Sequence, residues 1–194
     1  DANHPQTRVL KALLAAEDKD LLGAKEILEE NIAKGFCDDF TKISLSRIYT
    51  ELNIFDKAKK LIEEVIIKNP QNLNYLSDLS EVYIKEKDYE KALELAENIL
   101  KINPNYILGD ILGARIAYLK EDFEKTKEYA QEAISLDINC SEGYYYLALA
   151  REKMDDFEEA VECMKRAILY DLNNSNEYKF MYSELVKLNR KIRN

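Results

Sequence analysis

A period of 34 residues constrains this chain more than any other feature of its sequence. When the sequence is shifted by 34 residues against itself, apolar or small side chains coincide in four columns over five copies. The columns are Leu21, Phe55, Tyr89, Phe123, Phe157; Ala24, Ala58, Ala92, Thr126, Ala160; Leu28, Ile62, Ala96, Ala130, Met164; and Ile32, Ile66, Leu100, Ile134, Ile168. Neighbouring columns are three to four residues apart, which is the spacing of one helix face. The chain is therefore predicted to repeat a helical unit.

Each unit is long enough for two helices. In the third unit, apolar residues from Leu76 to Tyr83 predict a first helix over about 73–86. A second helix begins at Tyr89, and the pair Asn103-Pro104 ends it. The second helices of three units are preceded by an aspartate that can cap free backbone N–H groups, at Asp88, Asp122 and Asp156. Recurrent alanine predicts close helix packing at Ala58, Ala92 and Ala160.

Composition agrees with an all-α fold. Five glycines and three prolines in 194 residues are too few for the frequent turns of a β-sandwich or barrel. Charged residues make up 34% of the chain and apolar residues 46%, which argues against both a membrane protein and a disordered chain.

The pattern resembles the tetratricopeptide repeat, a 34-residue helix–turn–helix unit. The resemblance implies an all-α, right-handed superhelical solenoid of five helix pairs plus a C-terminal capping helix, which we expect to be one repeat domain over 1–194. The expected units are a degenerate repeat at 5–38, full repeats at 39–72, 73–106, 107–140 and 141–174, and a capping helix at 175–194. The sequence departs from the family pattern in having no tryptophan, in Gly113 and Arg151 at otherwise apolar positions, and in Ile138 and Leu172 in place of prolines.

The last segment contains one more amphipathic helix, expected at about 176–192 after a capping cluster at 173–176. A lone final helix in a repeat stack usually covers the exposed apolar face of the last unit. The alternatives are continuation into a further repeat or contact with a partner. Its basic end, with Lys187, Arg190, Lys191 and Arg193, also suits the negative pole of a helix.

The charge distribution disfavours nucleic acid as a partner. The chain carries a net charge of −9, and because residues 175–194 carry +3, the remaining body carries −12. Nucleic-acid affinity depends on basic groups that displace phosphate counterions. The acidic second-helix faces are interpreted as a solubility surface or, alternatively, as a surface that attracts basic partners.

Catalytic and metal-binding chemistry lacks its usual components. The single histidine, His4, lies near the start of the chain, so no Ser–His–Asp, Cys–His or two-histidine metal site is expected. No glycine-rich phosphate loop occurs, and no cofactor is expected. Three scattered cysteines, Cys37, Cys140 and Cys163, are interpreted as structural thiols in a reducing, cytoplasmic setting. The start at Asp1, with no apolar signal core in the first residues, suggests an excised or processed piece, so that any targeting segment would lie outside this sequence; no membrane insertion is expected.

The resemblance also assigns a binding surface. In the tetratricopeptide family the first helices line a concave groove that binds extended or helical peptides. The corresponding residues of this chain are Phe40, Ile43, Arg47, Asn74, Ser77, Glu81, Leu108, Ile111, Arg115, Tyr118, Tyr145 and Leu149. The lysine and asparagine with which chaperone-binding members hold a C-terminal carboxylate are missing from the two groove columns, so that role is not expected here.

The groove combines apolar side chains with alternating charges. Arg47, Glu81 and Arg115 occupy one column on successive units, where they either pair with one another or hold an acidic group of a ligand. The apolar positions suit an amphipathic partner. The sequence thus predicts a non-catalytic protein-interaction scaffold that binds a peptide or protein segment, amphipathic or basic, on its concave face. The alternative is an architectural segment of a larger protein or complex that self-associates through its terminal repeats.

Overall fold

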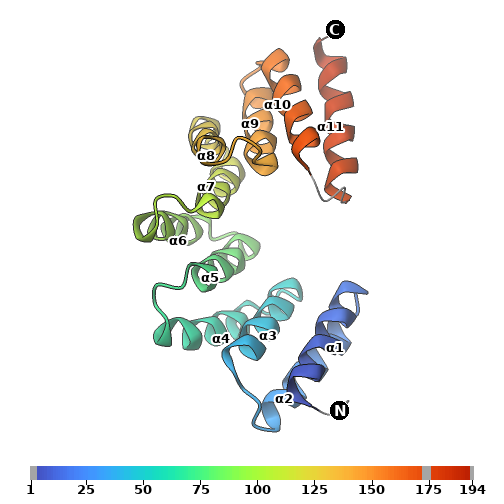
Figure 1. Ribbon diagram of the computed structural model, residues 1–194, viewed down its shortest axis with the longest axis vertical. Helices are drawn as coiled ribbons and strands as arrows, with labels where there is room; N and C mark the ends of the chain where they lie inside the picture. Colours follow the sequence, from blue (N-terminus) through green and yellow to red (C-terminus); the bar gives the residue numbers. More distant parts are fainter. Residues whose placement is uncertain (1–3, 172–175, 193–194) are drawn as a thin grey trace. The chain divides into compact units, whose positions relative to one another are not determined.

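The computed structural model describes residues 4–171 and 176–192, with the side chains of 176–179 excepted. These residues form eleven α-helices and no β-strand (Figure 1). The helices are α1 (Pro5–Glu17), α2 (Leu21–Ala33), α3 (Asp39–Glu51), α4 (Phe55–Lys68), α5 (Leu73–Glu86), α6 (Tyr89–Ile102), α7 (Ile107–Leu119), α8 (Phe123–Leu136), α9 (Ser141–Lys153), α10 (Phe157–Tyr170) and α11 (Asn176–Ile192). The predicted all-α class and the predicted helices at 73–86 and 176–192 are confirmed.

The chain divides into two compact units, residues 1–95 and 96–194, with the boundary inside α6. In the first unit α1 packs on α2 and α3 on α4, and the first helices of neighbouring repeats also touch, α1 with α3 and α3 with α5. In the second unit α7 packs on α8, α9 on α10, and α7 also contacts α9. In both units, therefore, the two helices of a repeat pack on each other and the first helices of neighbouring repeats are in contact. This arrangement is expected for repeats that bury each other's apolar faces in series.

Each unit has its own hydrophobic core, built from the periodic columns. In the first unit Leu28, Ile62 and Val65 are almost fully buried, and in the second unit Met164 and Ala130 are equally so. An aromatic residue opens four of the second helices, and each of these side chains is half-buried: Phe55, Tyr89, Phe123 and Phe157. Phe55 and Phe157 pack against the cores of their units, and none of the four aromatics is exposed.

The recurrent alanines mark close helix contacts, as predicted. Ala58, Ala92 and Ala160 are each fully buried. On α5, the buried Ser80 hydroxyl donates a hydrogen bond of 3.0 Å to the backbone carbonyl of Ala92 on α6. The Ser80 side chain reaches the Ala92 backbone because the small alanine side chain lets the two helices approach each other closely. A larger residue at this position would force the helices apart.

The predicted N-caps are confirmed at two positions and wrong at a third. Asp122 accepts a hydrogen bond from the Lys125 backbone N–H at 3.1 Å, and Asp88 accepts one from that of Lys91 at 3.3 Å. Asp156 makes no such bond to α10. Its carboxylate instead pairs with the Arg151 guanidinium at 3.0 Å, a charged donor that competes with the backbone for the same oxygens.

The turn inside each helix pair has a constant backbone conformation. Lys19, Asn53, Lys87, Glu121 and Asp155 adopt φ values between +59° and +66°, and they are spaced by 34 residues. This left-handed region costs a non-glycine residue roughly 1–2 kcal/mol. The repeat period therefore extends to a strained backbone position that the side-chain columns alone did not reveal.

The final helix covers the last repeat, as predicted. α11 packs on α10, and its Met181 and Leu188 are buried in the core of the second unit, with Leu185 packed against that core. Its basic end makes a specific contact, since Lys191 pairs with Glu152 of α9 at 2.8 Å. The side chains of the predicted capping cluster at 173–176 lie outside the described residues.

Candidate partner-binding surface

The predicted surface residues all lie on first helices. Three of them lie on α3, three on α5, four on α7 and two on α9. The division of the chain separates the six on α3 and α5 from the six on α7 and α9. The two groups are described in turn, each within its own unit.

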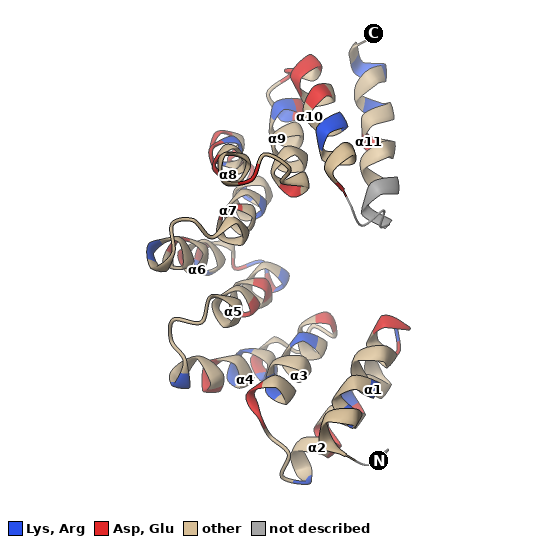
Figure 2. Cartoon of the chain, in the orientation of Figure 1, with Lys and Arg blue, Asp and Glu red and all other residues tan. Residues whose placement is uncertain are grey.

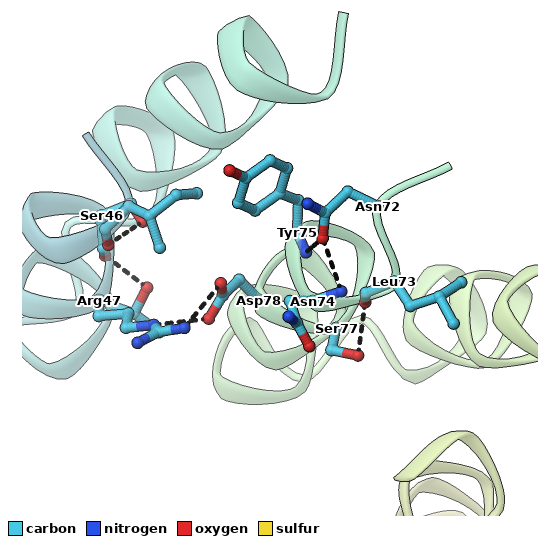
Figure 3. Close-up of polar contacts among 10 residues, drawn as sticks. Ser46, Arg47, Asn72, Leu73, Asn74, Tyr75, Ser77 and Asp78 are labelled. Atoms are coloured by element: carbon cyan, nitrogen blue, oxygen red, sulfur yellow. Dashed lines mark hydrogen bonds and ion pairs between the residues drawn. The ribbon is translucent and has the colours of Figure 1, made fainter. Parts of the chain in front are cut away.

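In the first unit, Arg47 of α3 forms a two-pronged ion pair with Asp78 of α5 (Figure 3). The Nε–Oδ1 distance is 2.7 Å and the Nη2–Oδ2 distance is 3.0 Å. The bond to the Asp78 carboxylate raises the pKa of Arg47 above its ordinary value. The carboxylate that the structure sets against Arg47 is thus Asp78, three residues before the Glu81 that the sequence pairing proposed.

This ion pair is accessible from solvent on the arginine side. The Arg47 side chain is 60% exposed, whereas that of Asp78 is 13% exposed. Arg47, Asp78 and Glu81 line a shallow hollow of about 250 Å³ between the two first helices. Because the Arg47 guanidinium remains exposed while it is paired, it can also donate to an acidic group of a ligand.

The start of α5 is organised by its own side chains. Asn72 accepts hydrogen bonds from the backbone N–H groups of Asn74 and Tyr75, at 3.1 and 3.4 Å (Figure 3). The Ser77 hydroxyl donates to the Leu73 carbonyl at 2.8 Å. Ser77 has therefore already used its proton within the helix and can only accept from a partner.

Burial removes two predicted residues from the exposed surface. Ile43 is 5% exposed and Leu149 is 7% exposed, and each belongs to the core of its unit. They anchor α3 and α9 to the cores of their units and are not accessible to a partner. Phe40 and Leu108, by contrast, are each 55% exposed and present large apolar surfaces to solvent.

In the second unit the predicted residues Leu108, Ile111 and Tyr145 line one cavity of about 650 Å³. This cavity, which we call the α7–α11 pocket, is bordered by α7, by the loop before α9, by α9 itself, and by the ends of α10 and α11 that face it. Its further described lining residues are Ile107, Asp137, Asn139, Cys140, Ser141, Glu142, Tyr146, Tyr170, Asp171, Phe180 and Met181. α11 follows α9 by about one period, since Met181 lies 34 residues after Leu147, but the columns did not indicate that this helix would line a pocket.

The remaining predicted residues of the second unit lie further along α7. Arg115 is half-buried there. The Tyr118 ring packs on Phe123, with 5.9 Å between the ring centroids, and burial raises the pKa of its phenol. Tyr118 thus joins the two helices of its own repeat.

A buried carboxyl group that sequence reasoning missed also lies on α7. Asp110 is 4% exposed, and its Oδ2 has no hydrogen-bond partner among the described residues. Burial, reinforced by the nearby charge of Glu132, raises its pKa from 3.8 to about 6. A carboxyl group in this environment favours the protonated, neutral form.

The cysteines differ from one another. Burial raises the pKa of Cys163 to about 11 and also raises that of Cys140, as suits structural thiols. The structural interpretation is wrong for Cys37, which is exposed.

Among the residues that the structure describes, no group of three or more histidine, cysteine or acidic side chains is arranged to hold a metal ion. Within the same residues, none of the helices has the length and apolar character needed to cross a membrane.

Lysine and arginine positions are interspersed with aspartate and glutamate positions along the helices (Figure 2). Many form short-range pairs, including Lys59 with Glu86 at 2.9 Å between α4 and α5. Such pairs orient neighbouring helices and add little stability individually. The fold and its surface define a class of protein: a helical-hairpin repeat protein whose first helices carry exposed apolar and charged side chains.

Comparison with known proteins identifies the family within this class. The family model described as "Psidin, N-terminal TPR repeats region" matches residues 1–112, and the model "Tetratricopeptide repeat" matches residues 141–174. The chain belongs to the tetratricopeptide repeat family. No curated protein matches the sequence significantly.

Solved structures show the same fold. A tetratricopeptide repeat protein of Thermus thermophilus, TTC0263, aligns with a TM-score of 0.77 at 16% identity, over 94% of this chain and 99% of that one. A structure of MamA from Desulfovibrio magneticus RS-1 aligns with a TM-score of 0.65 at 18% identity, over 88% of this chain and 97% of that one. These similarities concern the fold alone.

Proposed function

We propose that this chain is a non-catalytic interaction scaffold that binds an extended or helical segment of a partner protein along the first helices of its repeats. The observation that carries the proposal is the exposure of large apolar side chains on those helices. Phe40 and Leu108 occupy the same position of their repeats, and each exposes 55% of its surface. Exposed apolar groups among charged ones are the usual footprint of an amphipathic partner.

The Arg47–Asp78 pair supports the same proposal. It lies on adjacent first helices, and its guanidinium remains 60% exposed. A partner segment that lies across α3 and α5 can place a carboxylate beside Arg47 or a cation beside Glu81 without disturbing the core. The charged groups would therefore set the orientation of a segment whose affinity comes from the apolar positions.

Peptide selection tests this proposal directly. The intact chain is used to select binders from a displayed library of random peptides, and the binders are then measured against single variants by calorimetry. Phe40→Asp and Leu108→Asp are expected to weaken binding by about tenfold or more, the usual effect of losing a well-buried apolar contact. The matched controls are Ile67→Asp and Leu169→Asp, which alter apolar residues that are 80% and 70% exposed on second helices.

The controls give the experiment its power to refute. If the two second-helix variants weaken binding while the two first-helix variants do not, the binding surface lies on the other side of the repeats. Absence of any selected peptide that binds the folded chain would also count against a peptide-binding scaffold.

A second candidate function, self-association within a larger assembly, rests on exposed apolar residues at the terminal helices. Tyr182 and Val186 lie one turn apart on α11 and are 54% and 37% exposed. Leu10 and Leu14 lie one turn apart on α1 and are 58% and 61% exposed. Light scattering of the chain and of a Tyr182→Glu, Val186→Glu variant distinguishes this candidate. A dimer that the variant abolishes supports assembly, whereas a monomer in both cases removes the support.

A further inference from the structure

We infer that the α7–α11 pocket accepts an arginine or lysine side chain from the partner segment, an inference that rests on the proposed function and specifies its chemistry. The pocket is lined by Leu108, Ile111, Tyr145 and the other residues given above, and it encloses about 650 Å³. That volume is far larger than one side chain and leaves room for the apolar neighbours of the basic residue. Charge and aromatic content together select the occupant.

The lining carries one sign of charge. Asp137, Glu142 and Asp171 contribute carboxylates, whereas the described part of the lining includes no lysine, arginine or histidine. Arg166, on α10, lies over the Tyr144 ring at 5.5 Å from its centroid and is not part of the lining. An incoming cation therefore meets uncompensated negative charge, whereas an incoming carboxylate would be repelled.

One of these carboxylates has an unused acceptor. Oδ2 of Asp171 is buried, and no described group donates a hydrogen bond to it. A buried carboxylate oxygen without a donor is costly, and the positive charge of a guanidinium or ammonium group in the adjoining pocket offsets part of that cost. Asp137 differs, because its Oδ1 already accepts a bond of 2.9 Å from the Asn139 backbone N–H.

Aromatic rings form much of the remaining wall. The Tyr145 ring contacts Tyr146 and Phe180 edge-on, with centroid distances of 5.3 and 6.4 Å, and Tyr170 also lines the pocket. Ring faces attract cations, and the rings also cover the aliphatic stem of a long basic side chain. Arginine is the better fit of the two cations because its planar, weakly hydrated head stacks on tyrosine.

Two further polar groups of the lining are already used within the fold. The Ser141 hydroxyl donates to the Ala167 carbonyl at 2.8 Å, and the Cys140 sulfur accepts from the Gly143 N–H at 3.3 Å. Both groups are occupied within the fold. The pocket is thus acidic and aromatic, which is the combination that recognises an organic cation with an apolar stem.

Two matched peptides test this inference on the unmodified chain. The probe is acetyl-Leu-Arg-Leu-amide, and the control is the same peptide with citrulline, which has the shape of arginine without its charge. Amide chemical shifts are followed by NMR during titration. We expect saturable shifts at Gly143, Tyr145 and Tyr146, binding about fivefold or more tighter for the arginine peptide, and clear weakening at high salt. Equal binding of both peptides, or shifts confined to other helices, would overturn the inference.

Variants assign the effect to the carboxylates. The double variant Glu142→Gln, Asp171→Asn keeps the shape of the wall and is expected to remove the preference for arginine over citrulline. The control variant Glu158→Gln removes an exposed charge of α10 outside the pocket and is expected to keep the preference. If both variants behave alike, the attraction is the general negative charge of the chain, and the pocket is not the site.

The outcome is separable from that of the proposed function. If library peptides bind through Phe40 and Leu108 but the arginine preference is absent, only the cation pocket fails. If the arginine peptide binds in the pocket but no library peptide depends on the first helices, the wider scaffold surface fails. A dimer in light scattering that the double variant abolishes would assign the pocket to a second copy and overturn the inference of a partner segment.

Discussion

Replacement of Asp110 by asparagine should change the pH dependence of stability in a defined way. Folding raises the pKa of this carboxyl group from 3.8 to about 6, because burial disfavours its charged form. A group with a raised folded-state pKa contributes stability that is complete below its unfolded pKa and is lost as the pH rises through its folded pKa. The native chain should therefore lose this contribution between about pH 4 and pH 6, whereas the Asp110→Asn variant has no such contribution to lose.

The magnitude follows from the shift. Each unit of pKa difference corresponds to about 1.4 kcal/mol, so a shift of roughly two units changes the free energy of unfolding by about 3 kcal/mol. This is the expected change in the difference between variant and native chain from pH 4 to pH 8. It does not depend on how well the asparagine amide itself packs, because that effect is the same at both pH values.

The assay is urea denaturation followed by circular dichroism at intervals between pH 4 and pH 8. The difference in unfolding free energy, variant minus native, should rise with pH in favour of the variant. A Glu132→Gln variant is the control, because the Glu132 charge is the second cause of the raised pKa and its removal should shift the midpoint to lower pH. A difference that is flat with pH, or that rises as the pH falls, would refute the assignment of a buried, neutral carboxyl group.

Three further predictions follow from packing, backbone strain and thiol burial. Ala92→Leu should lower the free energy of unfolding by about 1–3 kcal/mol in urea, because Ser80 of α5 touches the α6 backbone there; a change within about 0.5 kcal/mol would contradict this close contact. Glu121→Gly should raise the free energy of unfolding by up to about 1 kcal/mol, since glycine adopts φ of +61° without strain, and a loss of stability would contradict the strain argument. Cys37 should react quickly with a thiol reagent at about pH 7.5, whereas Cys163, buried and with its pKa raised to about 11, should stay unreacted until the chain unfolds.

The helical framework could be predicted from the sequence because it depends on local and nearest-neighbour packing. The column from Leu21 to Phe157 repeats every 34 residues, and the structure begins a second helix at each of these positions. The column that contains Ala92 predicted a close helix contact, because a small side chain that recurs at the repeat period indicates a contact that every repeat makes. The handedness of the superhelix, the single-domain organisation and the cellular compartment stay predictions.

The candidate surface was less predictable because it depends on side-chain reach and on depth within each helix. Arg47 and Glu81 share a column, but the guanidinium reaches Asp78, a helix turn nearer the start of α5. Column position also does not distinguish the buried Ile43 from the exposed Phe40, which are three residues apart on one helix. Met181 of α11 continues the column of Leu79 and Leu147, but a column does not show which side chains will border a pocket.

Leu185 illustrates the practical value of this difference. It belongs to the apolar pattern of the last helix, and it packs against the core of the second unit. A charged substitution there would damage the fold and would give no information on assembly. The exposed Tyr182 and Val186 are the appropriate positions for that test.

The central claim is that partners are bound by the first helices of the repeats. NMR of the 22.6 kDa chain with a selected peptide tests it most directly, since backbone amide shifts report the bound face helix by helix. The account predicts that the largest shifts upon saturation fall on α3, α5, α7 and α9. Shifts concentrated on α4, α6, α8 and α10 would contradict it.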